Sequence, residues 1–266
     1  MKKLFLLLSV VSIVFMSCSS EDSPVSEPPL TNDGFVLKRM DILSPTQQIG
    51  GVWYYDGNKL DRCGNETTYV KYHYTGDLIT KMDFVNEGQL RSNEYYYYDG
   101  NQRLSSYKVL DYQTGLGSRF VYTYNDVNGT CVVTLFTGNL QTQDTPDTNF
   151  SRKLFFENGV VVKKQRSMVI DGNLETLTTE VAFDNKQNPK NAILGMSKLL
   201  LYENDNYGSP HNLISYTYSA TNATIIDVDV IQYTYNSYGF PITQKLLDPY
   251  DDGSGDIEFK YFYQQP

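Results

Sequence analysis

The sequence has few of the residues with which enzymes most often do chemistry. It contains two histidines, three cysteines and one tryptophan. His73 and His211 stand in unrelated settings, and no HExxH, Cys-x-x-Cys, P-loop or Gly-x-Ser-x-Gly pattern occurs. Metal, phosphate and acyl chemistry therefore have no signature, and we expect no cofactor. The absence favours a non-catalytic protein without excluding an enzyme.

Basic residues are also in the minority. Lys and Arg number 22 against 31 Asp and Glu, which gives a formal net charge of -9. An acidic surface repels phosphate backbones, so nucleic acid is not an expected partner.

The leader holds a short apolar run. Two lysines precede the apolar residues 4–15, which are too few to span a bilayer and are typical of an export signal. The segment FMSC then ends at Cys18 and resembles the lipobox of bacterial lipoproteins, although its Phe and Met depart from the usual residues. We expect a signal peptide over 1–17 and a lipid anchor at Cys18. A secretory signal with an incidental cysteine is the alternative.

Residues 18–33 are polar, acidic and rich in proline, which predicts a disordered tether. Glu21 and Asp22 resemble the surface-export signal of Bacteroidetes lipoproteins. These features favour an outer-membrane protein that is anchored to lipid and faces the cell exterior, with a periplasmic orientation as the alternative.

Tyrosine is abundant, with 23 residues, and it recurs just before short turn sequences. Examples are YYDGN, YHYTG, YYYDGN and YTYNSYG, in which Asp, Asn and Gly supply the positive φ of tight hairpin turns. Each unit predicts strand, turn and strand. Residues 34–266 are therefore expected to form one all-β domain, a long antiparallel meander of about 16–18 strands.

Side-chain parity predicts how this meander is folded up. Residues i and i+2 of a strand share a face, so the aromatic pairs lie on one face and mostly polar residues on the other. We expect a barrel-like or strongly curved sheet around an aromatic core. Asn188 and Pro189 are suited to begin a helix, which predicts one short helix near 189–201.

Two stretches resemble known families. The unit Tyr-x-Tyr-Asn/Asp followed by Gly resembles the YD repeat of Rhs-type proteins, and Asp184–Tyr218 resembles a segment of Bacteroidetes lipoproteins built from such repeats. The resemblance implies a large curled β-sheet that is porin-like in shape. It implies no activity, because those relatives have no established one.

A few residues break the two-face pattern. Tyr95 and Tyr97 fall on the otherwise polar face, and Trp53 adjoins Tyr54 so that the two rings must point to opposite faces. Exposed aromatic rings suit stacking on sugar rings. Together with His73, which lies on the polar face, Trp53, Tyr95 and Tyr97 are candidate ligand-stacking residues. Packing against a neighbouring loop is the alternative.

Two further sets of residues are weaker candidates. Asp248, Asp252 and Asp256 partly match a calcium loop, but the ligands expected at its third and twelfth positions are missing. An exposed hairpin turn explains them equally. Cys63 and Cys131 are a candidate disulfide in an oxidising envelope, with two buried thiols as the alternative.

The sequence as a whole predicts a non-catalytic envelope lipoprotein, a scaffold or binding module for glycan or another envelope protein. An envelope enzyme acting on carbohydrate is the alternative. An outer-membrane pore is favoured least, because neither face of the strands offers the Leu, Val and Phe expected of a lipid-facing band.

Overall fold

The computed structural model describes residues 36–44, 47–150, 152–170, 173–201, 209–221, 223–247 and 257–264. The predicted signal peptide, Cys18 and the tether lie outside the described residues, as do Asp248, Asp252 and Asp256. Among the described residues, no helix combines the length and the apolar character needed to cross a membrane.

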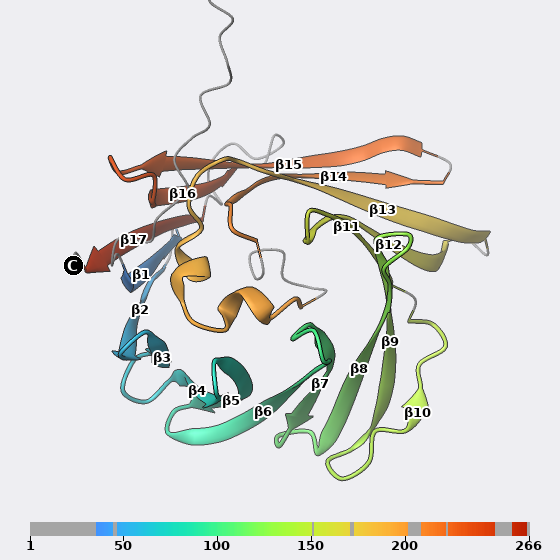
Figure 1. Ribbon diagram of the computed structural model, residues 1–266, viewed down its shortest axis with the longest axis horizontal. Helices are drawn as coiled ribbons and strands as arrows, with labels where there is room; N and C mark the ends of the chain where they lie inside the picture. The colour runs from blue at the N-terminus through green and yellow to red at the C-terminus, as the bar shows by residue number, and fades with distance from the viewer. Residues whose placement is uncertain are drawn as a thin grey trace, which may run out of the picture. The chain divides into compact units, whose positions relative to one another are not determined.

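Strands make up most of the described chain (Figure 1). Their bounds are β1 Val36–Ser44, β2 Gln47–Asp56, β3 Lys59–Gly64, β4 Tyr69–Thr75, β5 Leu78–Asn86, β6 Gln89–Tyr98, β7 Leu104–Asp111, β8 Leu116–Asn125, β9 Thr130–Asn139, β10 Thr145–Pro146, β11 Arg152–Glu157, β12 Val160–Ile170, β13 Asn173–Phe183, β14 Leu213–Ala220, β15 Ala223–Tyr235, β16 Pro241–Leu247 and β17 Glu258–Gln264.

The sheet closes into an antiparallel barrel of 16 strands. Neighbours in sequence pair around the ring, β9 pairs with β11, and β17 pairs with β1 to complete the circle. The short β10 forms two residue pairs with β9 and is not part of the ring. The predicted all-β meander is confirmed, and of the two expected forms the closed barrel is the one observed.

Most hairpins carry a β-bulge next to their turn. The pairing shifts by one residue beside the last aromatic residue of the first strand, as between Tyr54 and Tyr55 and between Tyr97 and Tyr98. The same shift recurs beside Tyr74, Phe156 and Tyr235. Bulges bend a strand and increase its twist, so their repetition helps the meander curl until its two ends meet.

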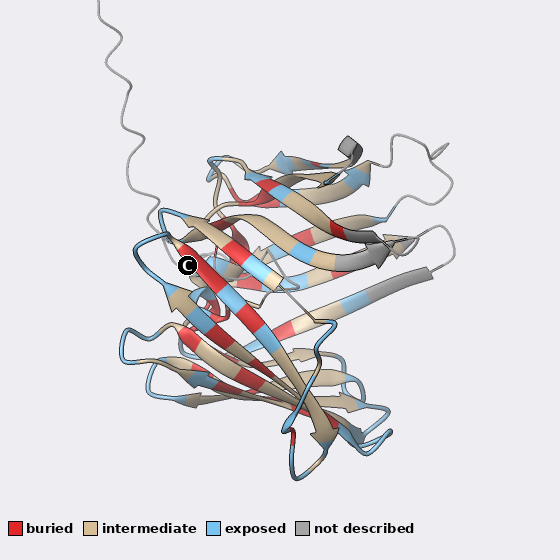
Figure 2. Ribbon diagram, turned by 90° about the vertical axis from the view of Figure 1, so that its right-hand side faces the viewer, coloured by how far each residue is buried: buried red, intermediate tan, exposed pale blue. Residues whose placement is uncertain are grey.

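The interior is the aromatic core that parity predicted. Tyr72, Tyr96 and Tyr122 are each at most 8% exposed, and Tyr107 stacks on Phe120 with ring centroids 4.5 Å apart. Figure 2 shows buried residues alternating with exposed ones along the strands. Close packing of this kind is expected of a filled barrel.

The last tyrosine before a turn usually ties two hairpins together through its hydroxyl group. Three of these hydroxyls donate to backbone carbonyls at 2.7–2.9 Å: Tyr55 to Leu37, Tyr98 to Ile79 and Tyr124 to Leu104. Tyr263, in the last strand, donates to the Pro241 carbonyl in the same way at 2.7 Å. The Tyr74 hydroxyl instead accepts from the Leu60 amide at 3.0 Å. Phenylalanine would fill the same space but leave the backbone group unbonded, which explains why tyrosine recurs here.

Residues 184–201, which follow β13, fold into the barrel (Figure 1). The expected single helix is replaced by two 3₁₀ helices, η1 Pro189–Ala192 and η2 Met196–Lys198, because Gly195 between them has a φ of 76° that an α-helix does not permit. Asn188 caps η1 as predicted, and its side chain accepts from the Lys190 amide at 3.0 Å.

Residues 189–201, called the plug from here on, are part of the core. Ile193, Met196 and Leu199 are at most 2% exposed and pack with the aromatic residues of the strands. The Leu194 amide also donates to the Asn58 carbonyl at 3.3 Å, in the turn between β2 and β3. The plug therefore fills the barrel at the end where the Asp-Gly and Asn-Gly turns lie.

Candidate functional site

Polar side chains on the outer faces of β4 to β7 form a connected group around Asp83. The Asp83 carboxylate lies 2.7 Å from His73 Nε2 and 2.7 Å from Lys81 Nζ. It also accepts from Asn93 Nδ2 at 2.5 Å, and the Tyr112 hydroxyl donates to Asn93 Oδ1 at 2.5 Å. These five residues are called the outer polar cluster.

Strand register explains why the cluster forms. Asp83 is paired with Asn93 across β5 and β6, and Lys81 is paired with His73 across β4 and β5. Directly paired residues on one face have their Cβ atoms about 4.5–5.5 Å apart, which brings Asn93 to Asp83. His73 reaches Asp83 diagonally across the two strands, and Lys81 reaches it from two residues away on the same face of β5. Tyr112 follows the last residue of β7 and folds over Asn93, which is only 3% exposed.

The cluster holds Asp83 in its charged form. Partial burial opposes ionisation, but hydrogen bonds from Lys81 and His73 outweigh it and lower the pKa of Asp83. The hydrogen bond to Asp83 in turn raises the pKa of Lys81. An ionised Asp83 with fixed donors around it suits the recognition of hydroxyl groups better than proton transfer.

Aromatic rings lie beside the outer polar cluster. Tyr95 is paired with Lys81 and Lys108, and Tyr97 lies two residues further along the same face of β6. Lysine ammonium groups lie over both rings, Lys81 at 5.6 Å from the Tyr95 centroid and Lys108 at 5.9 Å from the Tyr97 centroid. Tyr97 is 45% exposed and Tyr112 is 40% exposed. The structure thus brings His73, Tyr95 and Tyr97 together on one outer surface.

Trp53 does not join this surface. Its ring points into the barrel, is 4% exposed and belongs to the hydrophobic core, whereas the adjacent Tyr54 points outward and is 37% exposed. The two rings lie on opposite faces of β2, as side-chain parity predicted, and Trp53 is the one on the buried face. The prediction that Trp53 is an exposed stacking residue is therefore wrong.

Sequence reasoning missed Asp83, Asn93 and Tyr112. Asp83 and Asn93 lie on the polar face at strand spacing from Lys81 and Tyr95, so parity could have found them. Tyr112 lies beyond the strand, where parity gives no information.

Both cysteines of the barrel are free thiols. Burial raises the pKa of Cys63 to about 11, with a smaller opposing effect of Lys190, and burial raises the pKa of Cys131 to about 12. Thiols with such pKa values are poor nucleophiles at neutral pH. Within the described part of the chain, no three His, Cys, Asp or Glu side chains are grouped as a metal site.

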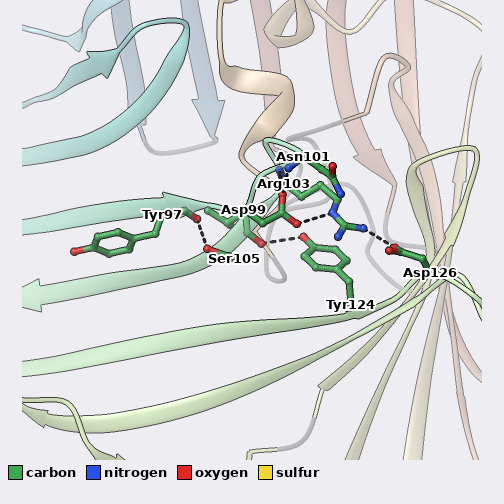
Figure 3. A network of polar contacts seen from close by, with 8 residues as sticks. Tyr97, Asp99, Asn101, Arg103, Ser105, Tyr124 and Asp126 are labelled. Carbon is green, nitrogen blue, oxygen red and sulfur yellow. Dashed lines mark hydrogen bonds and ion pairs between the residues drawn. The ribbon is translucent and has the colours of Figure 1, made fainter.

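A second polar network lies at the turn end of the barrel (Figure 3). Arg103 bonds Asp99 at 2.9 Å and Asp126 at 2.5 Å, and its guanidinium stacks 4.2 Å from the Tyr124 ring centroid. A cleft of about 310 Å³ separates this network from the plug at Lys198. Asp99 also accepts from two backbone amides of its own turn, so the network's evident role is to hold the turn in shape.

Comparison with solved structures identifies the kind of fold. A porin-like protein from Bacteroides vulgatus ATCC 8482 superposes with a TM-score of 0.51 at 11% sequence identity, over 87% of this chain and 99% of that chain. A porin-like protein from Bacteroides uniformis ATCC 8492 gives a TM-score of 0.46 at 7% identity, over 86% and 96% of the two chains. The barrel has a porin-like fold. No family model and no curated protein matches the sequence.

Proposed function

We propose that this protein is a non-catalytic binding module of the cell envelope that recognises glycan through the outer faces of β4 to β7. The observation that carries the proposal is the exposed ring of Tyr97 on the same face of β6 as the outer polar cluster, whose own Tyr112 is also exposed. Aromatic faces offer a platform for the apolar side of a sugar ring, and Asp83 with its neighbours offers hydrogen-bonding groups for sugar hydroxyls.

A pore receives less support. A membrane-spanning barrel needs an apolar outer band about 25 Å tall. The outer faces of β4 and β5 instead carry Lys71, His73, Lys81 and Asp83, all within strands. Side chains and the plug also occupy the interior, where a pore would need an open channel. The observation in favour of a pore is the porin-like fold.

An enzyme acting on carbohydrate also receives less support. Glycoside hydrolysis generally uses two carboxyl groups, one of them with a raised pKa so that it can donate a proton. Asp83 has a lowered pKa, and the outer polar cluster as described contains no second carboxyl group.

The proposal includes attachment to the outer membrane through a lipid on Cys18, with residues 18–33 as the tether and the barrel facing the cell exterior. The apolar leader that ends at Cys18 supports the anchor, and the porin-like fold agrees with an envelope location. Membership of a lipoprotein family with Rhs-like YD repeats is part of the same proposal.

The anchor has a direct test. The Cys18→Ala variant, expressed in a bacterium that processes lipoproteins, is expected to shift from the membrane fraction to the soluble fraction, because one residue carries the lipid. A variant that still partitions with membranes would argue against the anchor.

Glycan recognition is tested by a glycan-array screen of the purified protein, followed by titration of the sugar that binds best. The Tyr97→Ala variant is expected to weaken that binding at least tenfold, or about 1.4 kcal/mol, because it removes an exposed stacking face. Tyr238→Ala is the matched control, since Tyr238 is 56% exposed in the turn between β15 and β16. Failure of the wild-type protein to bind any sugar, or equal losses in the two variants, would refute the proposal.

A further inference from the structure

A cavity of about 390 Å³ lies inside the barrel. It is bordered by residues from β1 to β6, near the loop between β3 and β4. Its size falls within the range of small-molecule sites in proteins, about 300–1,000 Å³. It is separate from the outer polar cluster, which lies on the other face of the sheet.

The walls of the cavity are mostly apolar. Met40, Val70 and Phe84 contribute side chains that pack at the edge of the core, and Cys63 adds its thiol. Such a surface favours a ligand with an apolar body.

Two hydrogen-bond donors on residues that line the cavity have no acceptor. Trp53 is 4% exposed, and its Nε1 atom is buried without a partner among the described residues. The Nε atom of Arg91 is likewise buried and unpaired in the described structure. The Arg91 guanidinium lies 4.0 Å from the carboxylate of Glu87, a side chain that is 80% exposed. Buried donors are normally satisfied, so each of these two donors indicates a missing acceptor. Both atoms are covered in this structure, and a ligand in the cavity reaches them once the two side chains turn toward it.

Glycine at position 51 keeps the cavity open. A Cβ atom there would lie 3.9 Å from Cys63 Sγ and 4.0 Å from the Met40 carbonyl oxygen, which is ordinary van der Waals contact. The backbone at position 51 would therefore tolerate a larger side chain, and that side chain would extend into the cavity.

We propose that this cavity binds an amphipathic carboxylate, with an acyl chain against Met40, Val70 and Phe84 and a head group that accepts from Trp53 and Arg91. A carboxylate supplies several acceptor positions and the negative charge that a guanidinium prefers. The site is independent of the glycan surface, so either proposal can fail without the other.

Trp53 also provides the measurement, because it is the only tryptophan in the chain. The fluorescence of Trp53 in the full-length protein is followed during titration with decanoate and, separately, with decanol. Decanoate is expected to give a saturable change, and decanol to bind at least tenfold more weakly because it lacks the charge.

Three variants separate the contributions. Arg91→Gln is expected to weaken decanoate binding at least tenfold and to leave decanol binding unchanged. Arg62→Gln removes the same charge from the outer face, where Arg62 stacks on Tyr54 at 4.4 Å, and is expected to bind decanoate like the wild type. Gly51→Val is expected to abolish binding of both ligands by filling the cavity.

Alkylation of Cys63 gives a second measurement that needs no variant. Decanoate is expected to slow the reaction of the Cys63 thiol with excess iodoacetamide, which consumes the small thiolate fraction present, because Cys63 lines the cavity. The proposal is overturned if decanoate causes no saturable change in Trp53 fluorescence, if Arg62→Gln weakens binding as much as Arg91→Gln, or if decanoate leaves the alkylation of Cys63 unchanged.

Discussion

Raising the pH from 10 to 11 is expected to unfold the barrel. Burial raises the pKa of six tyrosines well above the ordinary value of about 10; they are Tyr55, Tyr98, Tyr124, Tyr233, Tyr261 and Tyr263. Four of them, Tyr55, Tyr98, Tyr124 and Tyr263, donate their hydroxyl protons to backbone carbonyls of a neighbouring strand. Ionisation would remove these bonds and leave charges in the core.

The direction of the effect follows from proton linkage. Below pH 10 the tyrosines are protonated in both the folded and the unfolded chain, so their contribution to stability is fully present. Above pH 10 the unfolded chain loses these protons while the folded chain keeps them, and the free energy of unfolding falls by about 1.4 kcal/mol per tyrosine and pH unit. Six such groups lower it by about 8 kcal/mol per unit, which is comparable with the whole stability of an ordinary domain, about 5–15 kcal/mol.

The measurement is a pH titration in which circular dichroism reports the strands and ultraviolet absorbance reports tyrosinate. The exposed tyrosines are expected to ionise first, and the buried ones together with the loss of strand signal. Tyr98→Phe is the control. It should lower the free energy of unfolding by about 1 kcal/mol at neutral pH, because one hydrogen bond is lost. It should also reduce the slope of that free energy against pH above pH 10 by the contribution of one tyrosine. Ionisation of all tyrosines near pH 10 with the strands intact would contradict the prediction.

Substitution of Gly195 by alanine is expected to destabilise the plug by about 2–5 kcal/mol. Gly195 has a φ of 76°, and a Cβ atom there would lie 2.7 Å from the Asp77 carbonyl oxygen and 3.1 Å from the Ile79 amide nitrogen. The left-handed conformation costs an alanine about 1–2 kcal/mol, and overpacking against backbone adds about 1–3 kcal/mol.

Gly76→Ala is a matched control for this experiment. Gly76 has a φ of 59°, but none of the described atoms would lie within 4 Å of an added Cβ atom. Only the backbone cost of about 1–2 kcal/mol is expected there. Thermal unfolding should therefore give Gly195→Ala the lower midpoint, by roughly 2–4 °C for each additional kcal/mol. Equal midpoints would mean that the plug is not packed tightly against β5.

The local features of the fold were predictable from the sequence, since each depends on neighbouring residues. The period of two assigned Tyr96 and Tyr122 to the interior, and the Asp-Gly and Asn-Gly sequences marked the turns. Trp53 is two residues before Tyr55 on the same face, so the same rule, applied consistently, would have placed it in the core.

The closure of the sheet and the form of the plug were not predictable in the same way. Closure depends on the pairing of β1 with β17, and no local pattern records a contact between the two ends of a chain. The single predicted helix failed at Gly195, whose conformation is favoured by the close approach of the β4–β5 turn. The outer polar cluster was found only in part, because it depends on register across four strands.

The seam between the first and last strands has a consequence for how the protein is made. Val36 pairs with Gln264, so β1 receives this partner only after residue 264 has been synthesised. Until then the nascent sheet has two unpaired edges, which are templates for intermolecular association. The long sequence separation of this contact also makes closure a slow step. The barrel is therefore completed only after synthesis of its last strand, and the interval before the seam forms is when the chain is most exposed to intermolecular association.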